Sequence, residues 1–226
     1  MATVIFDFDS TLITCESLEH VLESKKLDEK AMQQIREITN QGMSGAISFL
    51  SSLERRLRVV LLRRQDFVEF GQRAVELITP GMRELVAELQ QRSTDVWIVS
   101  GAAREAMLPV GKALGIPLER LLGVDLLWDA DGCYAGIDAD KPLNRSKWEG
   151  AQLVASLWTA PTISVGDGIT DFALYEHGLV QHFIAFTQNV RRQAVLDKRV
   201  PEARTVAALR QQLQELIHGD TVTSKK

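Results

Sequence analysis

Cysteine and long apolar stretches are both scarce in this sequence of 226 residues. The two cysteines, Cys15 and Cys133, form no C-x-x-C pair, and the four histidines have no metal-ligand spacing, so neither a disulfide framework nor a zinc site is indicated. No run approaches the roughly 18 apolar residues of a membrane-spanning helix, and no basic leader precedes the first apolar run. The net charge of −4 lacks the basic excess typical of nucleic-acid-binding proteins. We therefore expect a cytoplasmic protein with free thiols and no membrane or nucleic-acid partner.

What is present is a chain long enough for one large domain, or for a domain with an insertion. Its composition, 45% apolar and 25% charged, is ordinary for a globular protein. Apolar runs alternate with segments of helical spacing, an order that predicts a parallel sheet covered on both faces. The predicted strands are the first apolar run, from Val4, and residues 95–100, 122–128, 134–137, 162–165 and 182–186. The predicted helices span residues 80–92, 104–114, 145–158, 170–177 and 205–217.

Residues 15–76 interrupt this alternation with a region that has helical spacing throughout. Within it, Asn40-Gln41-Gly42 and Ser44-Gly45 are typical of helix ends. We expect a doubly wound, Rossmann-like α/β core made of residues 1–14 and 77–226. The region 15–76 is then an inserted bundle of helices that forms a cap on this core.

The first apolar run ends in two carboxylates, Asp7 and Asp9. Chemistry in α/β sheets lies just past the carboxyl ends of buried strands, and side chains two apart on a strand share a face. Two such charges repel each other unless a cation or a shared proton relieves them. The same residues are also typical of a turn, whereas a calcium-binding loop is excluded because its sixth and twelfth positions are Leu12 and Leu18. From these residues alone, a site and a turn both stay open.

Two later predicted strands also end in polar residues. Ser100-Gly101 follows one of them, and Gly166-Asp167-Gly168-Ile169-Thr170-Asp171 follows another. Lys147 lies between them, near the start of a predicted helix. Each has a structural explanation of its own, as a helix cap, a loop or a solvated lysine. Because the carboxyl ends of parallel strands open on one edge of a sheet, we expect these groups to converge with the first two acids.

The chemistry of this set suits phosphoryl transfer. Carboxylates bind a hard cation such as Mg²⁺, which keeps water ligands that a phosphate can replace. Ser100, at a helix start, can donate its hydroxyl and nearby backbone N–H groups to phosphate oxygens, and Lys147 supplies a compact positive charge. No G-x-G-x-x-G motif follows a strand and no G-x-x-x-x-G-K-[ST] loop occurs, which disfavours a dinucleotide site and a P-loop enzyme.

These motifs resemble those of the haloacid dehalogenase-like hydrolase superfamily and, within it, of the phosphoserine phosphatase family. The resemblance covers residues 3 to about 200. It rests on four ordered motifs: Asp7-Phe8-Asp9-Ser10-Thr11, Ser100-Gly101, Lys147 and Gly166-Asp167-Gly168-Ile169-Thr170-Asp171. The resemblance implies a Mg²⁺-dependent phosphomonoesterase that releases phosphate from L-phosphoserine through an aspartyl-phosphate intermediate.

The resemblance also implies catalytic roles at the matching positions. Asp7 would be the nucleophile that attacks phosphorus. Asp9 would protonate the leaving oxygen and then activate the hydrolytic water. Ser100 and Lys147 would hold the phosphoryl group, and Lys141 is a competing candidate for the role of the lysine.

The metal ligands follow from the same motifs. The implied ligands of Mg²⁺ are the carboxylate of Asp7, the backbone carbonyl of Asp9 and the carboxylate of Asp167. Asp171 would act on the metal site indirectly, by supporting the loop that carries Asp167.

Substrate choice is implied to lie in the cap. There, Glu16 would bind the ammonium group of an amino acid phosphate, and Arg56 would bind its carboxylate. Glu19 and Arg55 compete for these two roles, and both preferred residues also have a structural explanation, in a first helical turn and on the surface. The remaining residues of the implied substrate-binding set are Ser100, Gly101, Lys147 and Thr170.

One departure from the family pattern concerns the substrate. The family usually reads Ser-Gly-Gly-Phe where this chain has Ser100-Gly101-Ala102-Ala103, and alanine at position 102 is strained if the backbone needs a positive φ there. The substrate therefore stays open between phosphoserine and another small phosphomonoester. Two further hypotheses are a phosphotransferase, in which an alcohol captures the phosphoryl group, and an inactive domain that binds phosphorylated ligands. We expect a monomer or homodimer whose partner is a small phosphorylated substrate.

Overall fold

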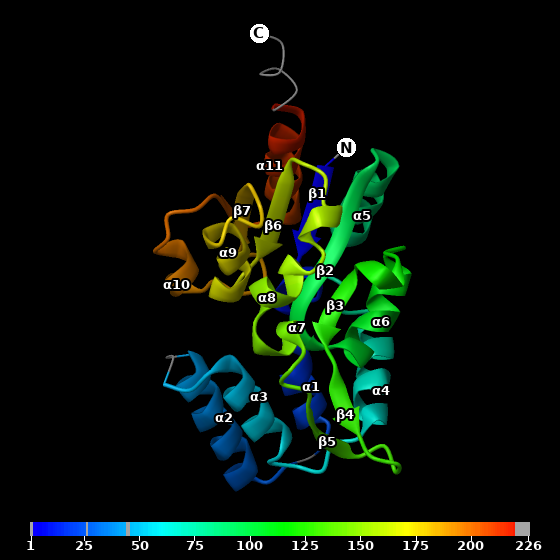
Figure 1. Cartoon of the computed structure of the whole chain (residues 1–226), viewed down its shortest axis with the longest axis vertical. Helices are drawn as coiled ribbons and strands as arrows, with labels where there is room; N and C mark the ends of the chain where they lie inside the picture. Colours follow the sequence, from blue (N-terminus) through cyan, green and yellow to red (C-terminus); the bar gives the residue numbers. More distant parts are fainter. Residues whose placement is uncertain (1, 26, 44–45, 220–226) are drawn as a thin grey trace.

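A six-stranded sheet lies at the centre of the fold, and all its neighbouring strands run parallel (Figure 1). The computed structural model describes residues 2–25, 27–43 and 46–219. The strands are β1 (Ala2–Phe6), β2 (Thr94–Ala103), β3 (Leu121–Val124), β6 (Thr162–Gly166), β7 (His182–Phe186) and β8 (Glu202–Ala203). Their order is β3-β2-β1-β6-β7-β8. The chain thus winds outward from β1 first to one side and then to the other, so the predicted doubly wound α/β core is confirmed.

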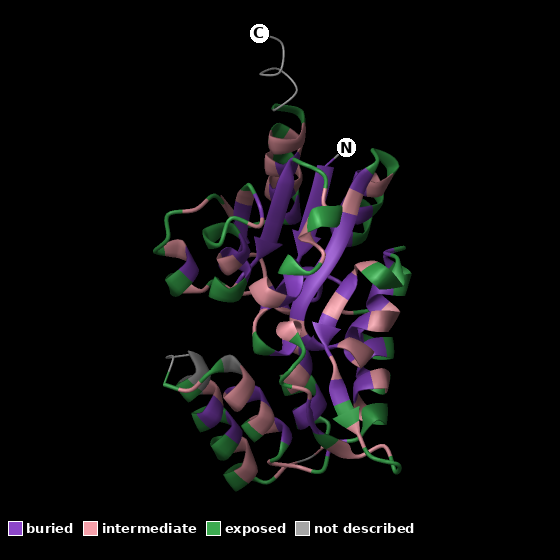
Figure 2. Cartoon of the chain, viewed as in Figure 1, coloured by how far each residue is buried: buried purple, intermediate pink, exposed green. Residues whose placement is uncertain are grey.

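Helices cover both faces of this sheet because its strands are apolar on both sides. Val4 and Phe6 of β1 belong to the larger buried core, whereas Ile5 belongs to a second apolar cluster. The larger core is shared with α5 (Met82–Gln91), α6 (Arg104–Ala113) and α11 (Val206–Gly219), and the second cluster with α8 (Lys147–Gln152) and α9 (Ile169–Glu176). Figure 2 shows the resulting buried sheet between partly exposed helices.

The single strand predicted for residues 122–128 is wrong. β3 ends at Val124, and the next residues form β4 (Leu126–Trp128), which pairs antiparallel with β5 (Tyr134–Ile137) in a separate hairpin. Asn144 explains the break, because its Oδ1 accepts from the backbone N–H of Asp125 at 3.2 Å and its Nδ2 donates to the Asp125 carbonyl at 3.3 Å. With both backbone groups bonded to a side chain, Asp125 cannot continue a strand ladder.

The single helix predicted for residues 145–158 is also wrong. The chain forms α7 (Pro142–Arg145), then α8, and then a short 3₁₀ turn at Ala155–Leu157. Ser146 separates the first two, because its backbone is extended and its Oγ accepts from the N–H of Glu149, as an N-cap does. The two-residue β8 and the single turn α10 (Gln193–Leu196) were not predicted, since elements this short have no periodicity.

The inserted region is helical, as predicted. It contains α1 (Ser17–Glu23), α2 (Glu29–Met43), α3 (Phe49–Leu57) and α4 (Arg64–Ala74). The helix end predicted at Asn40–Gly42 is confirmed, because α2 ends one residue later at Met43, and Ser44-Gly45 lies outside the described residues. Figure 1 shows α2 and α3 side by side beyond the carboxyl end of the sheet. Within the described ranges, no helix has the length and apolar character needed to cross a bilayer.

The insertion is tied to the core at three places. Where the chain leaves and re-enters the core, Ile13 and Ile78 form an antiparallel bridge, with Thr14 donating to the Leu77 carbonyl at 2.9 Å. Arg63, just before α4, forms another such bridge with Cys133 in the β4–β5 hairpin. The helix α4 itself leaves α2 and α3 and packs along α6.

The contact between α4 and α6 depends on Gly71. A Cβ at this position would lie 2.7 Å from the carbonyl oxygen of Ala106 and 3.0 Å from the ring of Pro109. Only a residue without a side chain lets the two helix backbones come this close.

We therefore expect Gly71→Ala to lower the free energy of unfolding by about 1–3 kcal/mol, because the overpacking outweighs the roughly 1 kcal/mol that alanine gains in a helix interior. Urea unfolding of the two proteins would measure the change as a shift in midpoint at constant slope. Gly219→Ala is the control, since a Cβ at Gly219 meets nothing within 4 Å. Equal midpoints for Gly71→Ala and the parent chain would contradict the close approach.

Candidate active site

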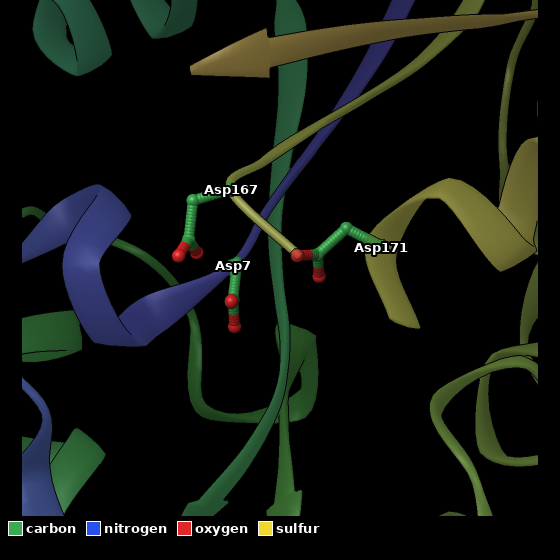
Figure 3. Close-up of side chains that lie close together, drawn as sticks. All are labelled: Asp7, Asp167 and Asp171. Atoms are coloured by element: carbon green, nitrogen blue, oxygen red, sulfur yellow. The ribbon is translucent and has the colours of Figure 1, made fainter. Parts of the chain in front are cut away.

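Three carboxylates meet at the carboxyl edge of the sheet (Figure 3). Asp7 follows β1, Asp167 follows the neighbouring β6, and Asp171 lies in the first turn of α9. All three are buried, and one oxygen of each lies within 4.8 Å of the others. The parallel pairing of β1 with β6, with Phe6 opposite Val165, places the first two acids at adjacent strand ends.

Asp171 is held by the chain through both of its carboxylate oxygens. Its Oδ1 accepts from Lys147 at 2.6 Å, and its Oδ2 accepts from the backbone N–H of Gly168 at 3.0 Å. Gly166 makes this possible, because a Cβ there would lie 2.3 Å from Cγ of Asp171. Gly166 and Gly168, on either side of Asp167, therefore leave room for the carboxylate of Asp171. This carboxylate in turn accepts from the backbone of the loop.

Lys147 is the cation at the centre of the site. Its Nζ lies 2.7 Å from Oδ1 of Asp7 and 2.6 Å from Oδ1 of Asp171, and its side chain is buried. Burial alone would lower the pKa of Lys147, but the charges of Asp171 and Asp7 outweigh it and raise the pKa above its ordinary value. The competing Lys141 is exposed and pairs with Asp125 at 2.6 Å instead.

One lysine does not balance the negative charge of this site. Burial, and then the charge of Asp7, raise the pKa of Asp167 to about 6, although Arg192 opposes them. Burial, and then Asp7, likewise raise the pKa of Asp171 well above its usual range in spite of Lys147. Three carboxylates beside two cations, Lys147 and Arg192, fit a site for one more cation, and their oxygens suit a hard divalent ion.

Asp9 lies beside this group, and its carboxylate is bonded to the start of α1. β1 ends at Phe6, so the expectation that Asp7 and Asp9 share one face of a strand is wrong. The carboxylate of Asp9 accepts at Oδ1 from the N–H of Ser17 and at Oδ2 from the hydroxyl of Ser17, both at 3.0 Å. Burial, then the charges of Glu16 and Asp7, raise the pKa of Asp9 well above its usual range.

The backbone after Asp7 forms a single tight turn over residues 8–12. Ser10 is buried there with a φ of 53°, in the left-handed region that L residues seldom adopt. Asn189, from the loop after β7, holds this turn by donating to the carbonyls of Ser10 at 3.1 Å and Ile13 at 3.3 Å, and to the hydroxyl of Thr79 at 2.8 Å. These bonds stabilise a strained backbone next to the acids.

Ser100 is buried at the same edge, but not at a helix start as expected. β2 continues to Ala103 and α6 begins only at Arg104, and the hydroxyl of Ser100 accepts from the N–H of Ala102 at 3.2 Å. Ala102 is absent from the residues at positive φ, so alanine is not strained at this position.

The expected substrate-binding residues lie at the start of the insertion and on α3. Glu16 accepts at Oε1 from the hydroxyl of Ser10 at 2.7 Å and from Arg192 at 2.7 Å. Arg56 is half-buried, and burial lowers its pKa against the opposing charges of Glu19, Glu16 and Asp9. The structure thus brings Arg56 into the electrostatic surroundings of Glu16.

The other candidates for substrate binding differ in exposure. Arg55 and Glu19 are both exposed, and so is Thr170 in the first turn of α9. Gly101 is half-buried beside Ser100.

Arg192 is a site residue that the sequence analysis missed. Its Nε lies 2.6 Å from Oδ2 of Asp167, and its Nη2 lies 2.7 Å from Oε1 of Glu16. Arg192 therefore connects Asp167, in the carboxylate cluster, with Glu16, the residue just before α1. Arg192 could have been considered from the sequence, because it follows the predicted strand at 182–186. This strand, β7, is parallel to β6, so the residues after it lie at the same edge of the sheet as Asp7 and Asp167.

The chain is similar to known phosphatases over most of its length. The model of the haloacid dehalogenase-like hydrolase family matches residues 4–176, a range that includes the three carboxylates. The phosphoserine phosphatase of Bos taurus is 32% identical over 197 residues, which cover 86% of this chain and 85% of that protein.

Solved structures show the same likeness. A phosphoserine phosphohydrolase-like protein from Francisella tularensis subsp. tularensis SCHU S4 has a TM-score of 0.85 at 37% identity, with 92% of this chain and 98% of that one covered. A phospho-aspartyl intermediate analogue of phosphoserine phosphatase has a TM-score of 0.70 at 26% identity, with 92% and 96% covered.

The raised pKa of Asp167 predicts how the stability of the metal-free protein depends on pH. The folded protein holds this proton more tightly than the unfolded chain, so the contribution of Asp167 to stability is lost as the pH rises from about 4 to about 6. For one such group the free energy of unfolding falls by at most about 1.4 kcal/mol per pH unit. Unfolding by denaturant in EDTA at several pH values would measure it.

Asp167→Asn removes this titration and is the matched comparison. The difference in stability between the variant and the parent chain should grow in favour of the variant as the pH rises through this range. A difference that stays constant from pH 4 to pH 7 would contradict the raised pKa.

Proposed function

Since this chain belongs to the haloacid dehalogenase-like hydrolase family and is a phosphatase, we propose that its substrate is L-phosphoserine, which it converts with water to L-serine and phosphate. The observation that carries the phosphoryl-transfer chemistry of this proposal is the buried cluster in which Lys147 joins Asp7 to Asp171, next to Asp167. The names of the relatives in Bos taurus and Francisella tularensis support the choice of phosphoserine.

The first chemical step is an attack by the carboxylate of Asp7 on phosphorus. A bond forms from phosphorus to the Asp7 oxygen as the bond to the serine oxygen breaks, and Asp9 gives its proton to the departing oxygen. Water then attacks the aspartyl-phosphate and passes a proton to Asp9, which frees Asp7 and phosphate. The similarity to the phospho-aspartyl intermediate analogue of phosphoserine phosphatase supports this route.

Mg²⁺ is the metal that we propose for the carboxylate cluster. The carboxylates of Asp7 and Asp167 and the backbone carbonyl of Asp9 would hold it, while Asp171, with both oxygens bonded to Lys147 and Gly168, would order the loop. When bound, the ion supplies positive charge that offsets the repulsion between Asp7 and the phosphate.

Lys147 and Ser100 hold the transferring phosphoryl group in this proposal. The ammonium of Lys147 is fixed by two carboxylates, so it is in place before charge develops on the phosphate oxygens. Ser100 offers a hydroxyl whose oxygen already accepts from Ala102, which leaves its own hydrogen free to donate.

The amino acid part of the substrate would lie between Glu16 and Arg56. Oε1 of Glu16 takes both the hydroxyl of Ser10 and Arg192, and among the described residues no hydrogen bond reaches Oε2, which can accept from an ammonium group. The guanidinium of Arg56 suits the substrate carboxylate. The helical region 15–76 would act as the cap that excludes bulk water, with α4 anchoring it on α6. The cytoplasmic location and the monomer or homodimer state stay predictions.

Replacing the nucleophile tests the reaction. Asp7→Asn should lower turnover of L-phosphoserine by about 1,000-fold or more, because removal of a nucleophile leaves only the binding contribution. Turnover of the parent enzyme should stop in EDTA and return with Mg²⁺. Phosphate release would be measured with and without a surplus of an acceptor alcohol, and Asp131→Asn, at an exposed hairpin acid, is the control. Full turnover in Asp7→Asn or in EDTA would overturn the mechanism, and transfer to the alcohol would indicate a phosphotransferase.

A second prediction concerns substrate recognition by Arg56. Arg56→Ala should raise KM for L-phosphoserine by about 10- to 100-fold, the effect of losing a hydrogen bond to a charged group. Its neighbour Arg55 is exposed, so Arg55→Ala should leave KM unchanged. O-phosphoethanolamine keeps the ammonium group but lacks the carboxylate, and its KM should not respond to either change. Equal KM values for L-phosphoserine in the parent enzyme and Arg56→Ala would remove this role.

A further inference from the structure

One residue of the first cap helix makes both hydrogen bonds to the carboxylate of Asp9. The backbone N–H of Ser17 donates to Oδ1, and the hydroxyl of Ser17 donates to Oδ2, each at 3.0 Å. Ser17 is 2% exposed, so water does not compete for these donors. Two bonds from one residue to the two oxygens fix both the position of the carboxylate and the plane in which it lies.

The start of α1 explains why Ser17 has a free backbone donor. Ser17 is the first residue of this helix, and the residue before it, Glu16, makes no side-chain cap bond. The first N–H groups of a helix need a partner from outside it. Asp9 supplies that partner, so the carboxylate caps the helix while the helix holds the carboxylate.

The arrangement leaves Asp9 able to exchange a proton. A carboxylate has about four lone-pair positions, two on each oxygen. Ser17 uses one position on each oxygen and leaves the other for a proton. On α1 the buried side chains Val21 and Leu22 pack into the main core, which keeps Ser17 in place relative to the turn that carries Asp9.

We propose that Ser17 is a positioning residue for the acid–base steps, one that aims the carboxylate of Asp9 at the leaving oxygen and then at the attacking water. This inference rests on the proposed function, because it takes Asp9 as the proton donor. Ser17 does not touch the substrate in this role. The docking of the first cap helix therefore sets the geometry of proton transfer in the core.

The test compares two leaving groups. The serine oxygen of L-phosphoserine needs a proton as it departs, whereas p-nitrophenyl phosphate releases a stable phenolate that needs none. Since kcat/KM reports the steps up to loss of the leaving group, Ser17→Ala should lower it about tenfold or more for L-phosphoserine, equivalent to about 1.4 kcal/mol. For p-nitrophenyl phosphate we expect less than about a threefold loss on the same scale. The loss with L-phosphoserine should lie in kcat, with KM unchanged.

Matched variants separate this role from a structural one. Ser17→Thr keeps the hydroxyl and should restore kcat. Ser24→Ala removes a hydroxyl at the other end of α1 that donates to the Val21 carbonyl, and it should leave kcat/KM unchanged with both substrates. If Ser17→Ala proves too unstable to assay, Ser17→Cys keeps the volume with a much weaker donor and takes its place.

Asp9→Asn distinguishes failure of the inference from failure of the proposed function. Loss of turnover in Asp9→Asn, together with full activity or equal losses for both substrates in Ser17→Ala, would overturn the positioning role and leave the proposed function standing. Full turnover of L-phosphoserine in Asp9→Asn would overturn the proposed acid–base role itself. A loss of kcat/KM confined to L-phosphoserine in both variants is the result that supports the inference, because hydrolysis of the aspartyl-phosphate comes after the steps that kcat/KM reports.

Discussion

The structure of this site depends on keeping several carboxylates together in a buried place. One carboxylate oxygen from each of Asp7, Asp167 and Asp171 lies within 4.8 Å of the other two. At this distance like charges repel strongly, because the side chains are buried and little water screens them. Lys147 bridges two of them and Arg192 binds the third, so two cations face three carboxylates. The fold therefore keeps an excess of negative charge in a buried place, and binding of a cation would reduce the repulsion.

The parallel sheet makes this arrangement possible. β1, β6 and β7 are adjacent and end at the same edge, so the loops after them bring Asp7 close to Asp167 and bring Arg192 into contact with Asp167. Asn189, in the same loop as Arg192, holds the strained turn at Ser10. The loop after β7 thus contributes one residue that shapes the backbone of the site and one that balances its charge.

The sequence predicted the features that depend on periodicity and on strand ends. The alternation of apolar runs gave the sheet and its flanking helices, and β7 has the bounds that were predicted. The sequence did not reveal side-chain bonds to distant backbone, such as those of Asn144 that end β3 at Val124. The direction of Asp9 was missed for the same reason, because its partner Ser17 follows an irregular turn that no period describes. Arg192 was missed because an arginine in a polar loop looks like any solvated residue until its two partners are located.

The two residues at the start of α1 have neighbouring positions but different partners. Glu16 contacts Arg192 and Ser10, while the N–H and the hydroxyl of Ser17 both donate to the carboxylate of Asp9. The residue proposed to bind the substrate is therefore next in the chain to the residue that bonds to Asp9. Residues 15–76 therefore cannot be exchanged without an effect on the core. A chimera that carries the corresponding helices of another protein would replace Ser17, and with it the two hydrogen bonds to the carboxylate of Asp9.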